Sequence, residues 1–236
     1  MSLIPRESAT ALLKLIEGEY KDIIRNKQLK RPYNEYIIKA KKIYEEIEKR
    51  VKKMGKLYRD GVTYDDSIIY IYTFDYALIA LRHRMLGQID KAEEIYHEIY
   101  SRIGKDRELY VVGVNLPYIR TDANAAMAIL HWRLGHRDKA KKIYYEINER
   151  IGKEGWLYKS GIDDPSIRTD ANAAMGIFCH ELDKIYEAKM ICHEIENKIE
   201  KDGELYKSGA GECFIPTAGN VEMEILYYLL GGMVIE

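Results

Sequence analysis

The chain lacks three features that would each point to a class of protein. Its 236 residues include only three cysteines, without CxxC spacing, so the sequence indicates neither a disulfide framework nor a structural zinc site, and we expect reduced thiols. No apolar run approaches the roughly 20 residues that a membrane-spanning helix needs. Residues 1–20 lack the apolar core of a secretory signal. These absences predict a soluble, cytoplasmic protein without a membrane partner.

An excess of positive charge is also absent. Lysine and arginine number 37 against 38 aspartates and glutamates, which gives a formal charge of −1 and disfavours a nucleic-acid partner. Glutamine occurs only at positions 28 and 88, while Lys, Ile, Glu and Tyr are abundant, a profile typical of a thermophile. No phosphate-binding loop, dinucleotide fingerprint or nucleophile elbow is present, and we expect no cofactor. A hydrophobic content of 47% excludes global disorder.

A repeat of about 48 residues runs through the chain. Leu-Tyr pairs begin at positions 57, 109, 157 and 205, at spacings of 52, 48 and 48. A threonine follows twelve residues after each of the last three pairs, and an asparagine comes three residues later: Thr121 and Asn124, Thr169 and Asn172, Thr217 and Asn220. A second segment, A-x-x-I-x-x-E-I, interleaves with the first at 40–47, 92–99, 140–147 and 188–195. Two interleaved registers indicate a repeat architecture.

Each unit is predicted to contain two unlike helices. The first type, such as 125–134, is apolar on nearly every side and so has neighbours all round, whereas the second, such as 138–151, has one wet face. We therefore expect an all-α fold of α-hairpins, with apolar inner and amphipathic outer helices. Each Leu-Tyr pair is expected in a short extended segment or hairpin at one rim. A single domain over 1–236 is predicted, made of an N-terminal helix pair and first rim loop (7–66), hairpin repeats with rim loops (67–120, 121–168 and 169–216) and a terminal inner helix (217–236).

The segments GKEGWLYKSG, IRTDANAAM and RLGHRDKAKKIY follow one another in this order. Over residues 40–232 the chain resembles the six-hairpin glycosidase-like superfamily, the (α/α) toroids of many carbohydrate-active enzymes. A closed ring of that kind has twelve helices and this chain supplies about nine, so the resemblance implies a toroid or an incomplete toroid arc. A tetratricopeptide-like solenoid is the alternative, although its period of about 34 residues is shorter.

The resemblance implies a protein that binds or processes saccharides. Glycoside hydrolysis needs two carboxyl groups roughly 5 to 9.5 Å apart, one of them with a raised pKa. Asp122 and Asp170 are the candidates, because they occupy equivalent rim ends of adjacent inner helices, and Glu212 in the last rim loop is a third. A structural alternative is that Thr121 and Thr169 cap these helices and that the helix dipole favours an aspartate at the next position.

The rim also supplies candidate substrate-binding residues: Arg120, Arg168, Asn124, Asn172, Tyr118, Trp156 and Tyr158. The arginines can hold a carboxylate or phosphate, or pair with the rim aspartates. The aromatic rings can stack on sugars, or the Leu-Tyr pairs can plug the hairpin ends. His131 and Cys179 share one inner-helix register, and we interpret them as core fillers and expect no metal.

A non-enzymatic function is the second hypothesis. An incomplete ring exposes an apolar inner face, which a peptide, a protein partner or a second copy of the chain can cover. The chain is then a helical-repeat scaffold. An oligosaccharide ligand is the partner that the enzyme hypothesis predicts instead.

Overall fold

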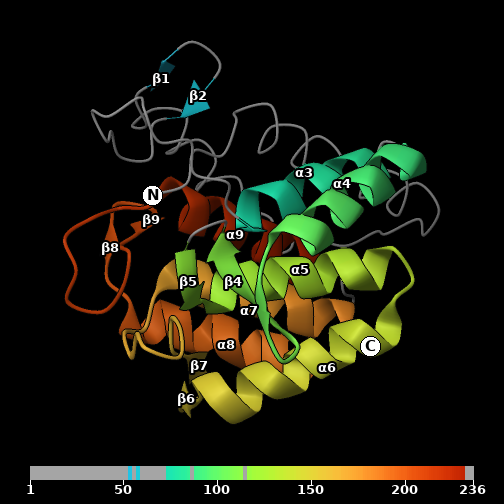
Figure 1. Ribbon diagram of the computed structural model, residues 1–236. Helices are drawn as coiled ribbons and strands as arrows, with labels where there is room; N and C mark the ends of the chain where they lie inside the picture. Colours follow the sequence, from blue (N-terminus) through green and yellow to red (C-terminus); the bar gives the residue numbers. More distant parts are fainter. Residues whose placement is uncertain (1–52, 55–56, 59–72, 86–87, 114–115, 232–236) are drawn as a thin grey trace.

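The computed structural model describes residues 53–54, 57–58, 73–85, 88–113 and 116–231 (Figure 1). Four of the helices in these ranges are of the inner type: α3 (Thr73–Met85), α5 (Thr121–Arg133), α7 (Thr169–Glu181) and α9 (Thr217–Gly231). Three are of the outer type: α4 (Ile89–Arg102), α6 (Arg137–Glu146) and α8 (Ile185–Lys198). The two helices of the N-terminal pair predicted within 7–66 lie outside the described residues.

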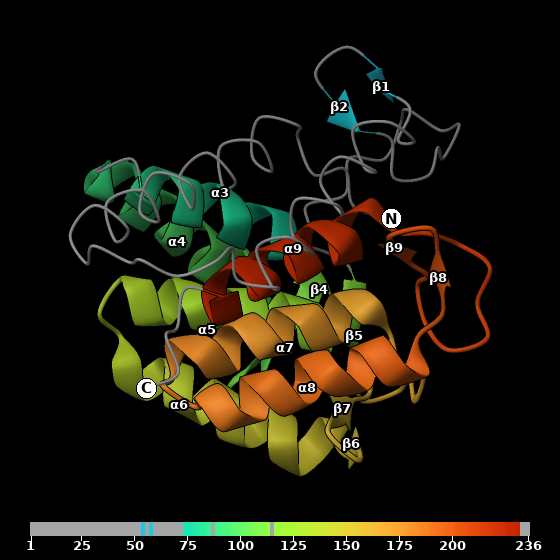
Figure 2. The same cartoon turned by 180° about the vertical axis from the view of Figure 1, so that it is seen from behind.

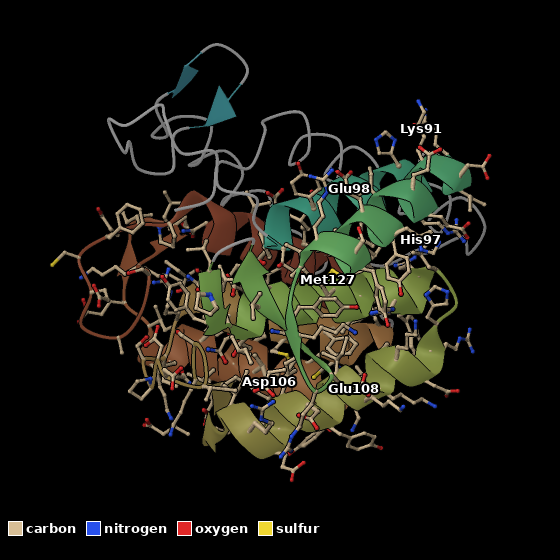
Figure 3. All side chains as sticks on the ribbon, viewed as in Figure 1. Lys91, His97, Glu98, Asp106, Glu108 and Met127 are labelled. Carbon is tan, nitrogen blue, oxygen red and sulfur yellow. The ribbon has the colours of Figure 1, made fainter. Side chains whose placement is uncertain are left out.

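The inner helices contact one another in the order α3, α5, α7 and α9, and α4, α6 and α8 each contact the preceding inner helix. Figures 1 and 2 show the resulting stack of helices from opposite sides. The two types differ in burial as predicted, because α7 is buried over most of its circumference whereas α4 buries one stripe. In Figure 3, Met127 of α5 lies inside the molecule, while Lys91 and Glu98 of α4 point outward.

Short antiparallel hairpins connect the helix pairs. They are β1 (Lys53–Met54) with β2 (Leu57–Tyr58), β3 (Lys105–Asp106) with β4 (Leu109–Gly113) and β5 (Leu116–Ile119), β6 (Lys153–Glu154) with β7 (Leu157–Tyr158), and β8 (Lys201–Asp202) with β9 (Leu205–Tyr206). In each hairpin a lysine is opposite the tyrosine of the Leu-Tyr pair. The predicted hairpin at each Leu-Tyr pair is therefore confirmed. Strands β4 to β9 lie toward the end at which the inner helices begin, which we call the rim (Figures 1 and 2).

Helix α6 does not end as an α-helix. Its last turn continues directly into a five-residue π-helix, η1 (Ile147–Ile151). Gly152, with φ of 82°, then reverses the chain into the β6–β7 hairpin. The outer helix of this unit is consequently joined to the rim without an intervening loop.

Helices α5 and α7 are each anchored at the first residue by the following rim loop. The Thr121 hydroxyl donates to the carbonyl of Lys159 at 2.5 Å, and its backbone N–H donates to Ser160. Thr169 bonds to Lys207 and Ser208 in the same way. The capping interpretation of these threonines is wrong: they are the first residues of their helices and the N-cap positions belong to Arg120 and Arg168. The hydroxyls join neighbouring units instead.

A glycine makes this junction possible, and replacing it provides a test. A Cβ added at Gly161 would lie well under 3.0 Å from the carbonyl oxygen of Ile119, on the adjoining strand. We expect Gly161→Ala to lower the free energy of unfolding by about 1–3 kcal/mol, because backbone atoms must move apart. Urea denaturation measures the change. Gly104→Ala is the matched control, since its added Cβ meets nothing nearer than 3.6 Å; equal effects in both variants would contradict the packing argument.

Candidate functional site

A chain of arginines and aspartates joins the rim ends of α5 and α7. Arg120 donates two hydrogen bonds to Asp122, from Nε at 3.0 Å and from Nη2 at 2.9 Å. The same Nη2 atom donates to Asp170 Oδ2 at 3.3 Å. Arg168 donates to Asp170 from Nε at 3.1 Å and from Nη2 at 2.9 Å. The structure thus brings together four of the predicted site residues, and Asp170 lies between two guanidinium groups.

The two aspartates have different electrostatic environments. Burial would raise the pKa of Asp170, but Arg168 and Arg120 outweigh it and lower the pKa below its ordinary value. Burial raises the pKa of Asp122, and the nearby Asp170 charge adds to this effect, while Arg120 and the backbone N–H of Ala123 oppose it. Two neighbouring carboxyl groups are therefore shifted in opposite directions, which is a pattern found at acid–base sites.

A third carboxyl group, that of Glu222, belongs to α9, which packs against α7. Its residue is 6% exposed, and its Oε2 atom is fully buried without a hydrogen-bond partner among the described residues. Burial raises the pKa of Glu222 well above its ordinary value; Asp170 and Asp122 raise it further and Arg120 opposes them. Glu222 therefore lies close enough to both aspartates to interact with their charges.

The sequence contained a signal for Glu222 that the motif analysis missed. Ala126 and Ala174 stand five residues after Thr121 and Thr169, and Glu222 takes the same position after Thr217. An acid inside the apolar segment VEMEIL breaks the repeat, and acids that break a repeat are candidates for function. Burial of the inner helices predicts core residues at such positions, so the pattern indicated repeat-breaking acids in the rim loops alone.

The asparagine of each unit holds the Leu-Tyr segment. The Tyr158 N–H donates to Asn172 Oδ1 at 2.6 Å, and Asn172 Nδ2 donates to the carbonyls of Tyr158 and Arg168. Asn124 makes the same three bonds to Tyr110 and Arg120. Both asparagines and Tyr158 are fully buried, so their polar groups support the rim from inside.

The tyrosines of the Leu-Tyr pairs reach into the inner helices. Tyr110 Oη lies 2.9 Å from His131 Nε2, and Tyr206 Oη lies 2.5 Å from Tyr227 Oη. These partners, like Cys179, are buried. The interpretations as plug and core filler are both confirmed.

The other predicted rim residues lie apart from one another. Tyr118 is 55% exposed on β5, and Phe214, three residues before Thr217 as Tyr118 is before Thr121, is 45% exposed. Trp156 packs against Tyr186 of the outer helix α8, with ring centroids 5.7 Å apart. Glu212 is exposed in the loop whose Gly209 pairs with Arg168.

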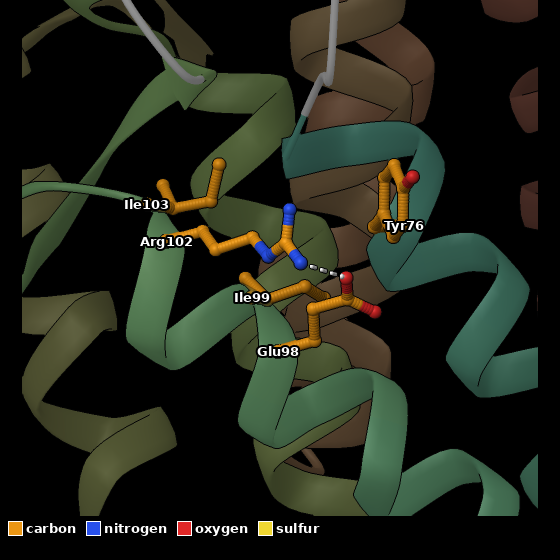
Figure 4. Close-up of a pocket in the computed structure, with 5 residues that line it drawn as sticks. All are labelled: Tyr76, Glu98, Ile99, Arg102 and Ile103. Carbon is orange, nitrogen blue, oxygen red and sulfur yellow. Dashed lines mark ion pairs between the residues drawn. The ribbon is translucent and has the colours of Figure 1, made fainter.

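A shallow hollow between α3 and α4 offers no comparable chemistry. Figure 4 shows its lining, with Tyr76, Ile99 and Ile103 around an ion pair from Arg102 to Glu98 at 3.1 Å. Within the described part of the chain, no group of three or more His, Cys, Asp or Glu side chains is placed to hold a metal ion. No helix there is long and apolar enough to cross a membrane.

Comparison with known proteins relates the chain to others by fold alone. No known family matches the sequence, and no curated protein is significantly similar to it. Among solved structures, a Salmonella enterica protein described as a possible member of the GH105 family is 10% identical and matches over 94% of this chain and 77% of its own, with a TM-score of 0.52.

Two further solved structures match with a TM-score of 0.47: the Lin0763 protein of Listeria innocua, 13% identical over 68% of this chain, and a polysaccharide lyase, 11% identical over 72%. The chain spans only 55% and 62% of the lengths of these two proteins. The possible GH105 member has an (α/α) toroid-type fold. The described residues of this chain are likewise mostly helical, with small sheets.

Proposed function

We propose that the chain forms an arc of an (α/α) toroid and binds or processes saccharides at the rim ends of α5, α7 and α9. The observation that carries this proposal is Arg120 shared between two aspartates. Since its Nη2 lies 2.9 Å from Asp122 Oδ2 and 3.3 Å from Asp170 Oδ2, these oxygens are no farther apart than about 6 Å. This upper limit is compatible with two carboxyl groups that act on one glycosidic bond.

Two further features support a saccharide ligand. Tyr118 and Phe214 expose aromatic rings at equivalent places in the rim segments that precede α5 and α9, on either side of the α7 unit, and such rings stack on sugars. The likeness in fold to a protein described as a possible member of the GH105 family also supports the proposal. We therefore assign the chain to a glycoside hydrolase-like activity.

A thermal-shift screen tests the proposal. Neutral saccharides, acidic saccharides and sugar phosphates are added to the purified protein, and a ligand that binds the folded state raises its melting temperature. At one hundred times its dissociation constant, a saccharide should add about 2.7 kcal/mol and raise the melting temperature by about 5–10 °C.

Variants locate the binding. Asp122→Asn and Asp170→Asn should reduce the saccharide shift, whereas Asp138→Asn, in the exposed first turn of α6, should leave it unchanged. No shift with any saccharide would contradict the proposal and favour the scaffold hypothesis. Equal loss in all three variants would contradict the assigned location.

A further inference from the structure

The three carboxyl groups of the site differ in their arginine contacts. Asp170 accepts three hydrogen bonds from two arginines and Asp122 accepts two from one. Glu222 Oε2 has no partner among the described residues. We propose that these contacts divide the work of the site: Glu222 donates a proton to the saccharide, Asp122 accepts one from water, and Asp170 stays a fixed anion. This inference rests on the proposed function.

The packing of α9 on α7 positions Glu222 for this role. A Cβ added at Gly219 would lie 3.0 Å from the backbone nitrogen of Asp170, so the first turns of the two helices touch. Glu222 follows three residues after Gly219, on the same helix face. Ala218 occupies the position that Asp122 and Asp170 hold in their own units. The fourth unit therefore lacks the repeated aspartate and carries its carboxyl group one turn deeper.

The buried oxygen of Glu222 points to a ligand. A buried polar atom without a hydrogen bond costs about 1–3 kcal/mol, and such atoms in folded proteins call for an explanation. An oxygen of a bound saccharide placed against a protonated Glu222 Oε2 regains this hydrogen bond. The unpartnered atom thus favours a ligand oxygen at the junction of α7 and α9.

The charges around Glu222 favour its protonated form. It faces Asp170 of α7, Asp122 of α5 and Arg120, which precedes α5. Arg120 is already bonded to both aspartates, so it offers Glu222 little compensation. Glu222 keeps its proton at a pH at which Asp170 is ionised.

Asp122 is the better proton acceptor of the two aspartates. It has one arginine partner and a raised pKa, whereas two arginines hold Asp170 in its charged form. A base works best when its pKa lies near the working pH. Asp170 consequently contributes a fixed negative charge that stabilises positive charge developing on the sugar.

The resulting step is balanced with water as the second reactant. The glycosidic oxygen takes the proton of Glu222 as its bond to the anomeric carbon breaks, and the electron pair of that bond stays on the oxygen. A water oxygen forms the new bond to the anomeric carbon and loses a proton to Asp122. That proton returns to Glu222 through solvent once the products leave.

Glu222→Gln tests the assignment, with Glu224→Gln as its matched control on the same helix and similarly buried. The substrates are the soluble oligosaccharides of the thermal-shift panel, and released reducing ends are measured. Glu222→Gln should lower turnover about 10²–10⁴-fold and keep the saccharide thermal shift, because glutamine still donates a hydrogen bond but transfers no proton. Glu224→Gln should turn over like the wild type.

The pH profile separates chemistry from structure. Wild-type activity should fall on the alkaline side as Glu222 ionises and on the acid side as Asp122 is protonated. Glu222→Asp should keep the alkaline limb, Asp122→Asn should remove the acid limb, and Asp170→Asn should lower turnover while both limbs remain. The pH profiles of these variants also test the assigned roles if Glu222→Gln does not fold.

Failure of the inference differs from failure of the proposed function. Wild-type-like turnover in Glu222→Gln, or an alkaline limb that persists in it, would overturn the role of Glu222 while saccharide processing stands. A wild-type protein that no saccharide stabilises would overturn the proposed function, and the inference with it.

Discussion

Replacing Asn172 with alanine is expected to lower the free energy of unfolding by about 2 kcal/mol or more, because the buried N–H and carbonyl of Tyr158 lose this partner at about 1–3 kcal/mol each. The Tyr158 N–H and the carbonyls of Tyr158 and Arg168 all bond to this one amide. Water cannot replace it, since Asn172 and Tyr158 are fully buried. The β6–β7 hairpin thus depends on a side chain that comes 14 residues after its tyrosine.

Urea denaturation measures this effect, with an expected fall in the midpoint and a similar slope. Asn124→Ala should behave alike, because Asn124 makes the same three bonds. Asn197→Ala on α8 is the control: Asn197 is exposed, and its loss should change the stability by no more than about 0.5 kcal/mol. Comparable small effects at all three positions would contradict the anchoring role.

The second large effect is a dependence of stability on pH that Glu222 causes. Because burial raises its pKa in the folded protein, the folded state holds a proton that the unfolded state releases above the ordinary glutamate value of 4.5. The free energy of unfolding therefore falls as pH rises from that value through the folded-state pKa. Glu222→Gln removes this loss. Its free energy of unfolding should rise relative to the wild type by about 1.4 kcal/mol for each pH unit between 4.5 and the folded-state pKa of Glu222.

Unfolding measured at a series of pH values tests the sign. Asp170 contributes in the opposite direction and in a different window: its pKa is lowered, so its stabilisation is present above the ordinary aspartate value of 3.8 and is lost at lower pH. The two groups can therefore be separated. Parallel pH profiles of the wild type and Glu222→Gln would show that Glu222 ionises at its ordinary value.

Much of this architecture could be predicted from sequence periodicity. The apolar character of TDANAAM predicts an inner helix, and the Leu-Tyr registers predict a hairpin at each rim connection. The Arg-x-Asp spacing also allowed a pairing of Arg120 with a rim aspartate, which the structure confirms. These features depend on residues close together in one unit, so the local pattern contains them.

Contacts between units could not be predicted in the same way. Thr121 matches the preference of a helix cap, yet its hydroxyl bonds to Lys159, which is 38 residues later. Likewise, Glu222 interacts with the charges of the two aspartates only because α9 packs on α7. The apolar sequence around Glu222 gave no reason to place this residue near the rim. Comparison of the four units position by position would have marked Glu222 and Glu224 as the acids that break the repeat in this helix.

The central claim is that three neighbouring carboxyl groups hold their protons to different degrees. A titration of the carboxyl ¹³C signals of Asp122, Asp170 and Glu222 by NMR measures this directly and requires no ligand. We predict that Asp170 titrates below its ordinary range, Asp122 above its own, and Glu222 last of the three. Ionisation of Glu222 at the ordinary glutamate pKa, or before Asp122, would contradict the proposed division of roles.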